Sequence, residues 1–375
     1  MRYRQITCVA IVLLGITFTP LSWAEFSYAN EVSKGFRQKA SIEVVEKSKT
    51  ASPLKKNESL ISAKGIKELD GAFKDAGSRA MLISVGGRLA YEKYSSPFFS
   101  KWWRPLGFSM SKSVTAILIG RAHCDGYITS LGDQVQKYVP TLKDTSWGIA
   151  SVRDLLMMAS GAYATSLTYN GHKTRQMEMN IGEPILTGRM NRDFIEYMKS
   201  EDDKKFPPGK YWNYSNFDTI ALGILLTEST GKPVAKYMEE TLWAEIKSEY
   251  DGAWVVNNLK QTSTYQGFSA HPHDWIRLGQ WMLSNLKSGD SCMSDYLKQM
   301  VTNQIGSEGN SDKYGFQTWI EGSYGVDFFF AGFGGQYLAF NLKSDSVMYH
   351  HAATDNSLVR ITYPRFGYVV EKLLN

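Results

Sequence analysis

Residues 108–119 read FSMSKSVTAILI and open the most apolar helical pattern in the chain. Ser109 and Lys112 stand three residues apart at its start. On a helix, this spacing places two side chains on one face, one turn apart. The first turn of a helix also has free backbone N–H groups and the positive end of the helix dipole, which stabilise developing negative charge. The stretch therefore predicts a buried helix that presents a serine hydroxyl beside a lysine amine.

The serine and lysine side chains together suit nucleophilic catalysis. A serine hydroxyl attacks when a neighbouring base takes its proton. Lys112 lies between Met110 and an apolar helix face, and desolvation lowers the pKa of a lysine, so that its neutral amine can act as that base. The four-residue pattern alone is weak, because serine is a common N-cap and lysine a common helix residue. Ser111 does not compete, since Val114 stands where its lysine would be needed.

A second stretch, residues 206–216, reads FPPGKYWNYSN. Its Pro-Pro-Gly turn delivers an aromatic run to the start of the next helical pattern. Tyr214 and Asn216 stand two apart in what we predict to be a non-helical segment, so both could face one cleft. A phenol near a lysine cation loses its proton more easily and can act as base and then as acid, and an amide can hold the lysine or a substrate carbonyl. The alternative is an aromatic core strand followed by an asparagine cap.

A third stretch, residues 331–336, reads AGFGGQ and follows an aromatic strand pattern. Glycines let a backbone pass close to a ligand and present its N–H groups. An oxyanion hole needs two such donors. A simple glycine-rich turn is the alternative for this stretch taken alone.

In this order, S-x-x-K, Y-x-N and a glycine-rich strand segment resemble the penicillin-binding protein and serine β-lactamase superfamily. Residues 131–140, residues 151–156 with Ser160-Gly161, and the Pro-Pro-Gly turn also look like landmarks of that superfamily. Residues 242–246 and 269–279 resemble its 6-aminohexanoate-dimer hydrolase branch. The similarity covers the chain from about residue 62 to its end.

The resemblance implies roles for individual residues. Ser109 would be the acylated nucleophile, Lys112 its base and Tyr214 the second acid/base. The backbone N–H groups of Ser109 and Gln336 would form the oxyanion hole. The branch also uses an additional tyrosine beyond Ser160-Gly161, and the sequence leaves both Tyr163 and Tyr169 open for that place.

The resemblance further implies a substrate-binding surface made by Asn216, Phe333, Gly334 and Gly335. The last three occupy the place where many relatives have Lys-Thr-Gly and where some nylon-oligomer relatives have a histidine. No side chain here supplies that cation. We therefore expect an ester or neutral amide substrate rather than the carboxylate-bearing substrate of a β-lactamase or carboxypeptidase.

Local patterns indicate an α+β fold of the α/β-sandwich type, like that of β-lactamases and DD-peptidases. Two strand-like runs flank Gly86-Gly87, which is a hairpin signal. The other expected elements are strands at 326–331, 337–341 and 346–350 and helices at 61–73, 217–230 and 365–374. Strands near both ends predict an antiparallel sheet flanked by helices, with a mainly helical lobe at about 109–300 inserted into a domain of residues 61–375.

The first residues suggest export. Arg2 and Arg4 precede an apolar run at 8–18, and Ser22 and Ala24 fit a signal-peptidase site. We expect a signal peptide at 1–24, a mature chain from Glu25 in the periplasm or outside the cell, and no stable membrane insertion. A retained anchor helix is the alternative. Residues 25–60 are polar and rich in Lys and Ser, so we expect a loosely ordered lead-in.

Two cysteines, Cys124 and Cys292, would remain after cleavage. They could form a disulfide in an oxidising compartment or be two small buried residues. Clusters that could hold a metal are limited to residues 271–274 and 350–351, and the first reads as a helix start, where side chains two apart diverge. We expect no metal and no cofactor.

These observations predict a secreted serine hydrolase that cleaves a small ester or amide through an acyl-enzyme. The net charge of +5 includes no dense basic run, so nucleic acid is not an expected partner. The expected partner is a small-molecule substrate, and the oligomeric state stays open. The alternatives are a non-catalytic relative that binds cell-wall fragments or a partner protein, and a β-lactamase or DD-peptidase.

Overall fold

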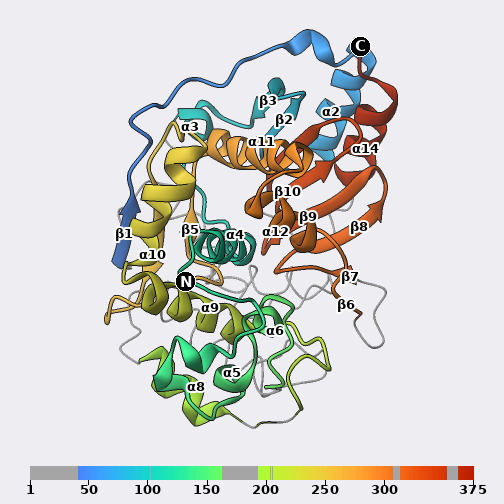
Figure 1. The fold of residues 1–375 in the computed structure, drawn as a ribbon. Helices are drawn as coiled ribbons and strands as arrows, with labels where there is room; N and C mark the ends of the chain where they lie inside the picture. The colour runs from blue at the N-terminus through green and yellow to red at the C-terminus, as the bar shows by residue number, and fades with distance from the viewer. Residues whose placement is uncertain are drawn as a thin grey trace, which may run out of the picture.

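The computed structural model describes residues 41–101, 103–162, 193–202, 204, 206–306, 313–352 and 362–375. In these residues, an eight-stranded antiparallel sheet has the strand order β3-β2-β11-β10-β9-β8-β7-β6 (Figure 1). The strands are β2 Ser78–Val85, β3 Arg88–Tyr94, β6 Ile305–Gly306, β7 Lys313–Tyr314, β8 Trp319–Ser323, β9 Val326–Gly332, β10 Gln336–Asn341 and β11 Ser346–Ala352. Segments from both ends of the chain thus form one sheet, which confirms the predicted fold class.

The hairpin of β2 and β3 forms where the sequence predicts it. Gly86 and Gly87 have φ of 55° and 73°, and such left-handed conformations at both central turn positions favour glycine. At its other edge β2 pairs with β11. Successive side chains of a strand point to opposite faces, so Leu82 lies in the core toward the helical lobe and Ile83 in the core on the opposite face.

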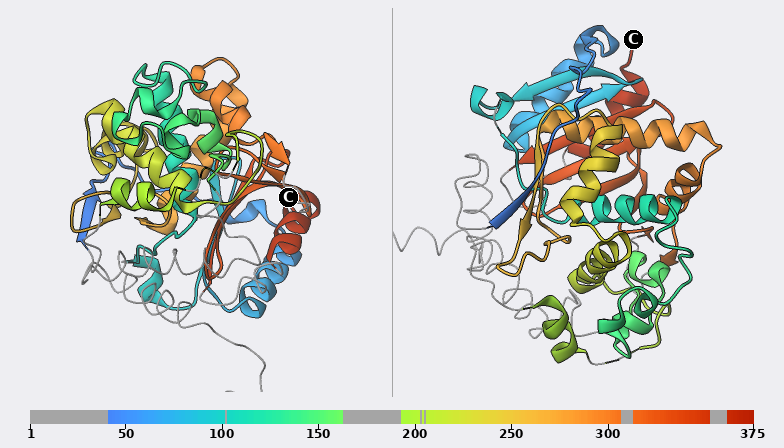
Figure 2. Two further views of the ribbon diagram at one scale, coloured as in Figure 1. Left: turned by 90° about the horizontal axis from the view of Figure 1, so that it is seen from below. Right: turned by 60° about the vertical axis from the view of Figure 1, so that its left-hand side comes forward.

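Helices cover both faces of the sheet (Figures 1 and 2). On one face, α2 (Ala63–Asp75) and α14 (Thr362–Lys372) pack against each other and against β2 and β10. On the other face, α11 (Pro272–Ser288) contacts β2, β10 and β11. The predicted helices at 61–73 and 365–374 correspond to α2 and α14.

The helical lobe is built around α4, which is buried on all sides over most of its length. α9 packs on α4 and follows the apolar pattern predicted at 217–230. The helices of this region are α4 Met110–Cys124, α5 Ser146–Ile149, α6 Val152–Leu156, α8 Phe194–Glu201, α9 Asn216–Thr230 and α10 Val234–Met238. Further short helices are η2 Glu58–Leu60, α3 Pro97–Lys101, η3 Val135–Lys137, η4 Pro140–Leu142, η5 Glu239–Trp243 and α12 Cys292–Met300.

Residues 41–60 differ from the expected loose lead-in. β1 (Ser41–Val45) pairs with β4 (Gly252–Val256), which also pairs with β5 (Phe268–Ser269). Farther along, Arg277 of α11 donates a hydrogen bond to the carbonyl of Ser52. Composition does not reveal that residues 41–60 are ordered, because the residues that hold them, β4 and Arg277, lie more than two hundred residues further along the chain.

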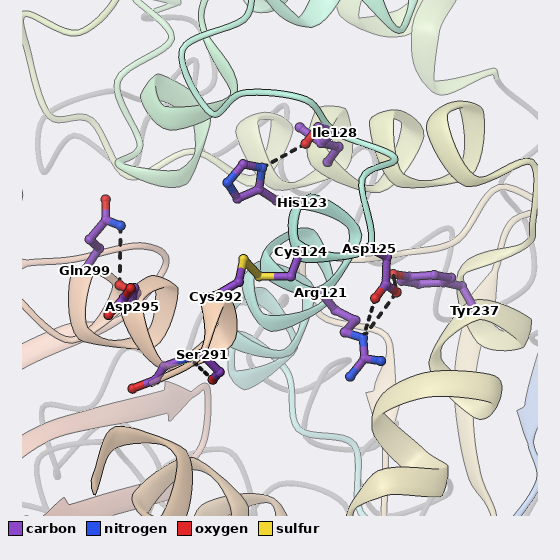
Figure 3. Close-up of a disulfide and its surroundings, with 11 residues drawn as sticks. Arg121, His123, Cys124, Asp125, Ile128, Tyr237, Ser291, Cys292, Asp295 and Gln299 are labelled. Atoms are coloured by element: carbon purple, nitrogen blue, oxygen red, sulfur yellow. Dashed lines mark hydrogen bonds and ion pairs between the residues drawn. A yellow bond between two sulfur atoms is a disulfide. The ribbon is translucent and has the colours of Figure 1, made fainter. Parts of the chain in front are cut away.

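A disulfide joins Cys124, the last residue of α4, to Cys292, the first residue of α12 (Figure 3). The two helices also pack closely beside it. A Cβ at Gly120 would lie 2.3 Å from the Tyr296 ring, and the Tyr296 hydroxyl donates a 2.7 Å hydrogen bond to the Ala116 carbonyl. The sequence left open whether Cys124 and Cys292 pair, and the structure shows that they form a covalent link between α4 and α12.

We expect Cys292→Ser to lower the free energy of unfolding by about 2–5 kcal/mol, because the bond closes a long loop and restricts the unfolded chain. The sequence separation is 168 residues. Guanidinium unfolding should give the same loss for the Cys124→Ser/Cys292→Ser double variant and for the reduced wild type. An unchanged unfolding midpoint in all three would contradict the prediction.

Candidate active site

Ser109 lies at the start of α4, as the spacing predicts. It is the N-cap residue of the helix and is half-buried. Phe108 before it has φ of 46°, a left-handed conformation that is uncommon for a bulky residue and often marks a functional turn. The Lys112 N–H bonds back to the Ser109 carbonyl at 3.1 Å. The serine hydroxyl therefore lies at a sharp turn, at the N-terminal end of the largely buried α4.

Lys112 lies one turn further along α4 and is 1% exposed. Its Nζ lies 3.0 Å from the Ser109 Oγ and 3.0 Å from the Tyr265 carbonyl oxygen. Burial disfavours the ammonium form of a lysine. The amine is therefore buried and in hydrogen-bond contact with the Ser109 hydroxyl.

Tyr214 meets this pair from the loop before α9. The Lys112 Nζ lies 4.9 Å from the centroid of the Tyr214 ring. The ring stacks on Trp319 of β8 with centroids 5.6 Å apart and an interplanar angle of 22°. The preceding Asn213 donates from its backbone N–H to the Met158 carbonyl at 2.8 Å. The structure thus brings Tyr214 to the pair of Ser109 and Lys112, although it lies far from them in the chain.

The sequence suggested that Asn216 lies in a non-helical segment, but the structure places it in a helix. It is the first residue of α9, with Ser215 as the N-cap, and its side chain is half-buried. The Ser215 hydroxyl accepts a hydrogen bond from the Asp218 N–H at 3.2 Å. Serine is a strong N-cap, so the helix begins directly after it. The predicted contact of Asn216 with substrate stays a prediction.

A buried carboxylate supports the loop that carries Tyr214. Asp218 is fully buried on α9 and accepts hydrogen bonds from the Ser160 hydroxyl at 2.7 Å and from the Trp147 indole at 3.0 Å. Burial raises the pKa of Asp218 to about 7, against the lowering effect of hydrogen bonds from Ser160, Ser215 and Trp147. Asp218 therefore ties the start of α9 to the Ser160-Gly161 landmark.

The glycine-rich stretch brings the sheet to the turn that precedes Ser109. A Cβ on Gly332, the last residue of β9, would lie 2.2 Å from the Gly107 carbonyl oxygen. Phe333 is 38% exposed, and its ring lies 6.0 Å from that of Phe108. This close backbone approach requires glycine at 332 and places Phe333 beside the residue that precedes Ser109.

The glycines at 334 and 335 form the turn between β9 and β10. Gly334 and Gly335 have φ of 77° and 93°, which favours glycine. Gln336, 2% exposed, begins β10 opposite Gly332 of β9 and His351 of β11. Its place in the oxyanion hole stays a prediction. Tyr163 and Tyr169 lie outside the described residues.

The segment 264–268, which no sequence pattern indicated as functional, also lies against α4. The Thr264 carbonyl accepts a hydrogen bond from Thr115 at 3.0 Å, the Tyr265 carbonyl accepts one from Lys112, and the Phe268 N–H donates to the Ser111 hydroxyl at 2.9 Å. No motif marks this segment. Its role follows from contacts between residues about 150 positions apart.

The histidines weighed as metal ligands have other partners. The His271 Nδ1 accepts from the His273 N–H at 3.1 Å, and the His273 Nε2 lies 2.6 Å from a Glu92 oxygen. The His350 Nε2 lies 2.7 Å from the Ser78 hydroxyl. Within the described ranges, no group of three or more His, Cys, Asp and Glu side chains is arranged to hold a metal ion. Of the helices in that part of the chain, none is long and apolar enough to cross a membrane.

Comparison with solved structures finds the same fold. A 6-aminohexanoate-dimer hydrolase homologue from Bacillus anthracis matches with a TM-score of 0.76 and 22% identity over 94% of this chain and 96% of that one. EstCE1, a hydrolase with promiscuous acyltransferase activity, matches with a TM-score of 0.62 and 15% identity over 82% and 98% of the two chains. A β-lactamase/D-alanine carboxypeptidase from Pseudomonas syringae matches with a TM-score of 0.57 and 16% identity over 81% and 99%. At these identities the likeness shows the fold alone.

No curated protein matches the chain. The family model described as Beta-lactamase matches residues 80–359, which include the serine–lysine turn, the tyrosine loop and the glycine-rich end of β9. This match spans most of the chain and agrees with the eight-stranded sheet and the buried α4. The chain therefore belongs to the β-lactamase family of serine hydrolases.

Proposed function

We propose that this protein is an exported serine hydrolase that cleaves a small ester or linear amide through an acyl-enzyme at Ser109. The observation that carries the proposal is the 3.0 Å contact between the Lys112 Nζ and the Ser109 Oγ, with the lysine buried. A general base must lie within hydrogen-bond reach of the proton that it takes. The Tyr214 ring lies 4.9 Å from the same amine, which makes its phenol the candidate for the second proton-transfer group.

In the proposed reaction, the neutral amine of Lys112 takes the hydroxyl proton as Ser109 Oγ bonds to the substrate carbonyl carbon. Backbone N–H groups of Ser109 and Gln336 would stabilise the oxyanion. The C–O or C–N bond then breaks, Tyr214 gives its phenolic proton to the departing alcohol or amine, and the Lys112 ammonium returns a proton to Tyr214. A water molecule releases the acyl group from Ser109 by the same proton transfers in reverse.

The surface beside Ser109 suits an uncharged acyl group. Phe333 presents an aromatic ring against Phe108 where many relatives carry a lysine. A charge-assisted hydrogen bond to a substrate carboxylate contributes about 1.5–3 kcal/mol, and residues 333–335 have no side chain that could make it. We therefore infer a preference for neutral esters and amides over carboxylate-bearing lactams and peptides.

The proposal of export rests on two independent observations. Residues 1–24 have the charged, apolar and small-residue succession of a signal peptide. Cys124 and Cys292 form a disulfide, a bond that persists in oxidising compartments such as the periplasm.

Lys112→Arg tests the base. Arginine keeps the positive charge but does not give up its proton at neutral pH, so acylation should fall by about 10²–10⁴-fold. The rate of p-nitrophenyl acetate hydrolysis and of labelling by a fluorophosphonate probe would measure the loss. Ser109→Ala should abolish labelling, and Lys298→Arg on the exposed face of α12 is the matched control. Labelling by the Lys112→Arg variant at the wild-type rate would leave the lysine a structural role only.

A substrate panel tests the inferred preference. We expect p-nitrophenyl acetate and butyrate, and short neutral amide oligomers, to be hydrolysed faster than nitrocefin or D-Ala-D-Ala peptides at matched enzyme concentration. The physical reason is the uncharged surface at Phe333. Faster turnover of nitrocefin would contradict the preference, and no turnover or labelling of any kind would favour a non-catalytic binding protein.

Gly332→Ala tests the close approach of the sheet to the nucleophile turn. The added methyl group would collide with the Gly107 carbonyl and displace β9 from Ser109. A displacement of about 1 Å can cost about 10²-fold in rate, so kcat/KM for p-nitrophenyl butyrate should fall by that order. Gly132→Ala is the control, since an added Cβ there meets its nearest neighbour at 3.5 Å. Equal activity of the two variants would argue against a role for this approach.

A further inference from the structure

Lys112 contacts two aromatic residues, and only one of them has a role in the proposed reaction. The Nζ lies 4.9 Å from the ring centroid of Tyr214 and 5.4 Å from that of Tyr265. Both distances lie within the range of a cation–π attraction, about 6 Å. Tyr265 is 2% exposed, so its ring acts on Lys112 in a desolvated environment.

The backbone around Tyr265 is held tightly in place. Thr264 accepts from Thr115 of α4 and donates from its hydroxyl to the Thr219 carbonyl of α9 at 2.8 Å. On the other side, the Phe268 carbonyl accepts from the Gly107 N–H at 2.7 Å. Two helices and the nucleophile turn therefore fix the residues on both sides of Tyr265. A side chain held in this way has a constant position relative to Lys112.

A buried base must satisfy two opposed requirements. Burial favours the neutral amine that can take the Ser109 proton, but it also penalises the ammonium that forms when the proton is taken. An aromatic face offsets that penalty, because the ring quadrupole attracts a cation and has little effect on a neutral amine. Tyr214 presents such an aromatic face from the loop before α9, but in the proposed reaction it also transfers protons. Tyr265 is the aromatic residue that can stabilise the ammonium throughout the reaction.

We propose that the ring of Tyr265 is a positioning residue that raises the proton affinity of Lys112 and so sets the pH range in which the base works. The inference rests on the proposed function, since it concerns the base of that reaction. Side-chain variants of Tyr265 isolate the effect of the ring. The backbone carbonyl that accepts a hydrogen bond from Lys112 remains in all of them.

The titratable groups around the amine come from several elements. Tyr214 and Tyr265 contact it directly. Tyr314 of β7 packs edge-on against Tyr214 with ring centroids 6.4 Å apart, and burial raises its pKa well above the usual value. Asp218 of α9 is engaged by Trp147 and Ser160. The Tyr214 and Tyr265 rings contact the amine directly, and replacing the Tyr265 ring leaves the proposed proton-transfer groups in place.

The experiment replaces Tyr265 by Phe, by Leu and by phenylalanines that carry one, two or three ring fluorines, and records kcat/KM for p-nitrophenyl butyrate against pH. Loss of the aromatic face in Tyr265→Leu should move the acidic limb to lower pH by about 0.5–1.5 units, the equivalent of a cation–π attraction at a desolvated site. Tyr265→Phe retains the aromatic face, so the acidic limb should stay at its wild-type pH. Each added fluorine weakens the ring quadrupole without changing the shape much, so the limb should move down stepwise.

The fluorinated series keeps the test valid if Tyr265→Leu does not fold. The same fluorinated residues at Phe340, a buried strand position in β10, are the control and should leave the limb unchanged. We also expect kcat to fall in the Leu variant with little change in KM, since the ammonium develops only during the reaction. A limb that stays in place across the series, or moves to higher pH, overturns the inference.

The proposed function is tested separately. If Ser109→Ala and Lys112→Arg abolish hydrolysis but fluorination at position 265 does not shift the acidic limb, only the role of Tyr265 is contradicted. If the wild type neither hydrolyses the ester nor is labelled at Ser109, the proposed function itself fails.

Discussion

The burial of one lysine amine is the constraint on which the rest of this structure depends. A buried amine is costly unless other groups bond to it. The Lys112 Nζ takes its contacts from three parts of the chain: Ser109 on its own helix, the carbonyl and ring of Tyr265, and the ring of Tyr214. The start of α4, the segment 264–268 and the loop before α9 must therefore keep fixed relative positions.

The other polar groups of α4 extend the same logic along the helix. Ser111 accepts from the Phe268 N–H, Ser113 donates to the Gln317 carbonyl at 2.5 Å, and Thr115 donates to the Thr264 carbonyl. Buried polar groups are nearly always hydrogen-bonded, so a helix with this many of them must be surrounded by specific partners. The disulfide from Cys124 to α12 adds a covalent link at the far end. α4 is thus held along its length, which fixes the position of Ser109 at its start.

The sheet contributes to the site through its backbone and through aromatic side chains. Gly332 brings β9 against Gly107, and Phe333 places its ring next to Phe108. Trp319 of the neighbouring strand β8 stacks on Tyr214. α2 and α14 lie behind the sheet and bury its other face. The surroundings of Ser109 are therefore rich in aromatic groups, which agrees with the proposed preference for a neutral substrate.

What the sequence by itself determined were the features that rest on local periodicity and spacing. The helix pattern after Ser109 predicted that Lys112 lies one turn away, and Gly86-Gly87 predicted the hairpin of β2 and β3, because both depend on residues close together in the chain. The approach of Tyr214 to this pair was expected only through the resemblance to a family. Tertiary structure alone decided the pairing of Cys124 with Cys292, the order of residues 41–60 and the place of Tyr265 beside Lys112. Most of these depend on contacts between distant segments, and no periodicity in either segment records which partner the folded chain brings to it.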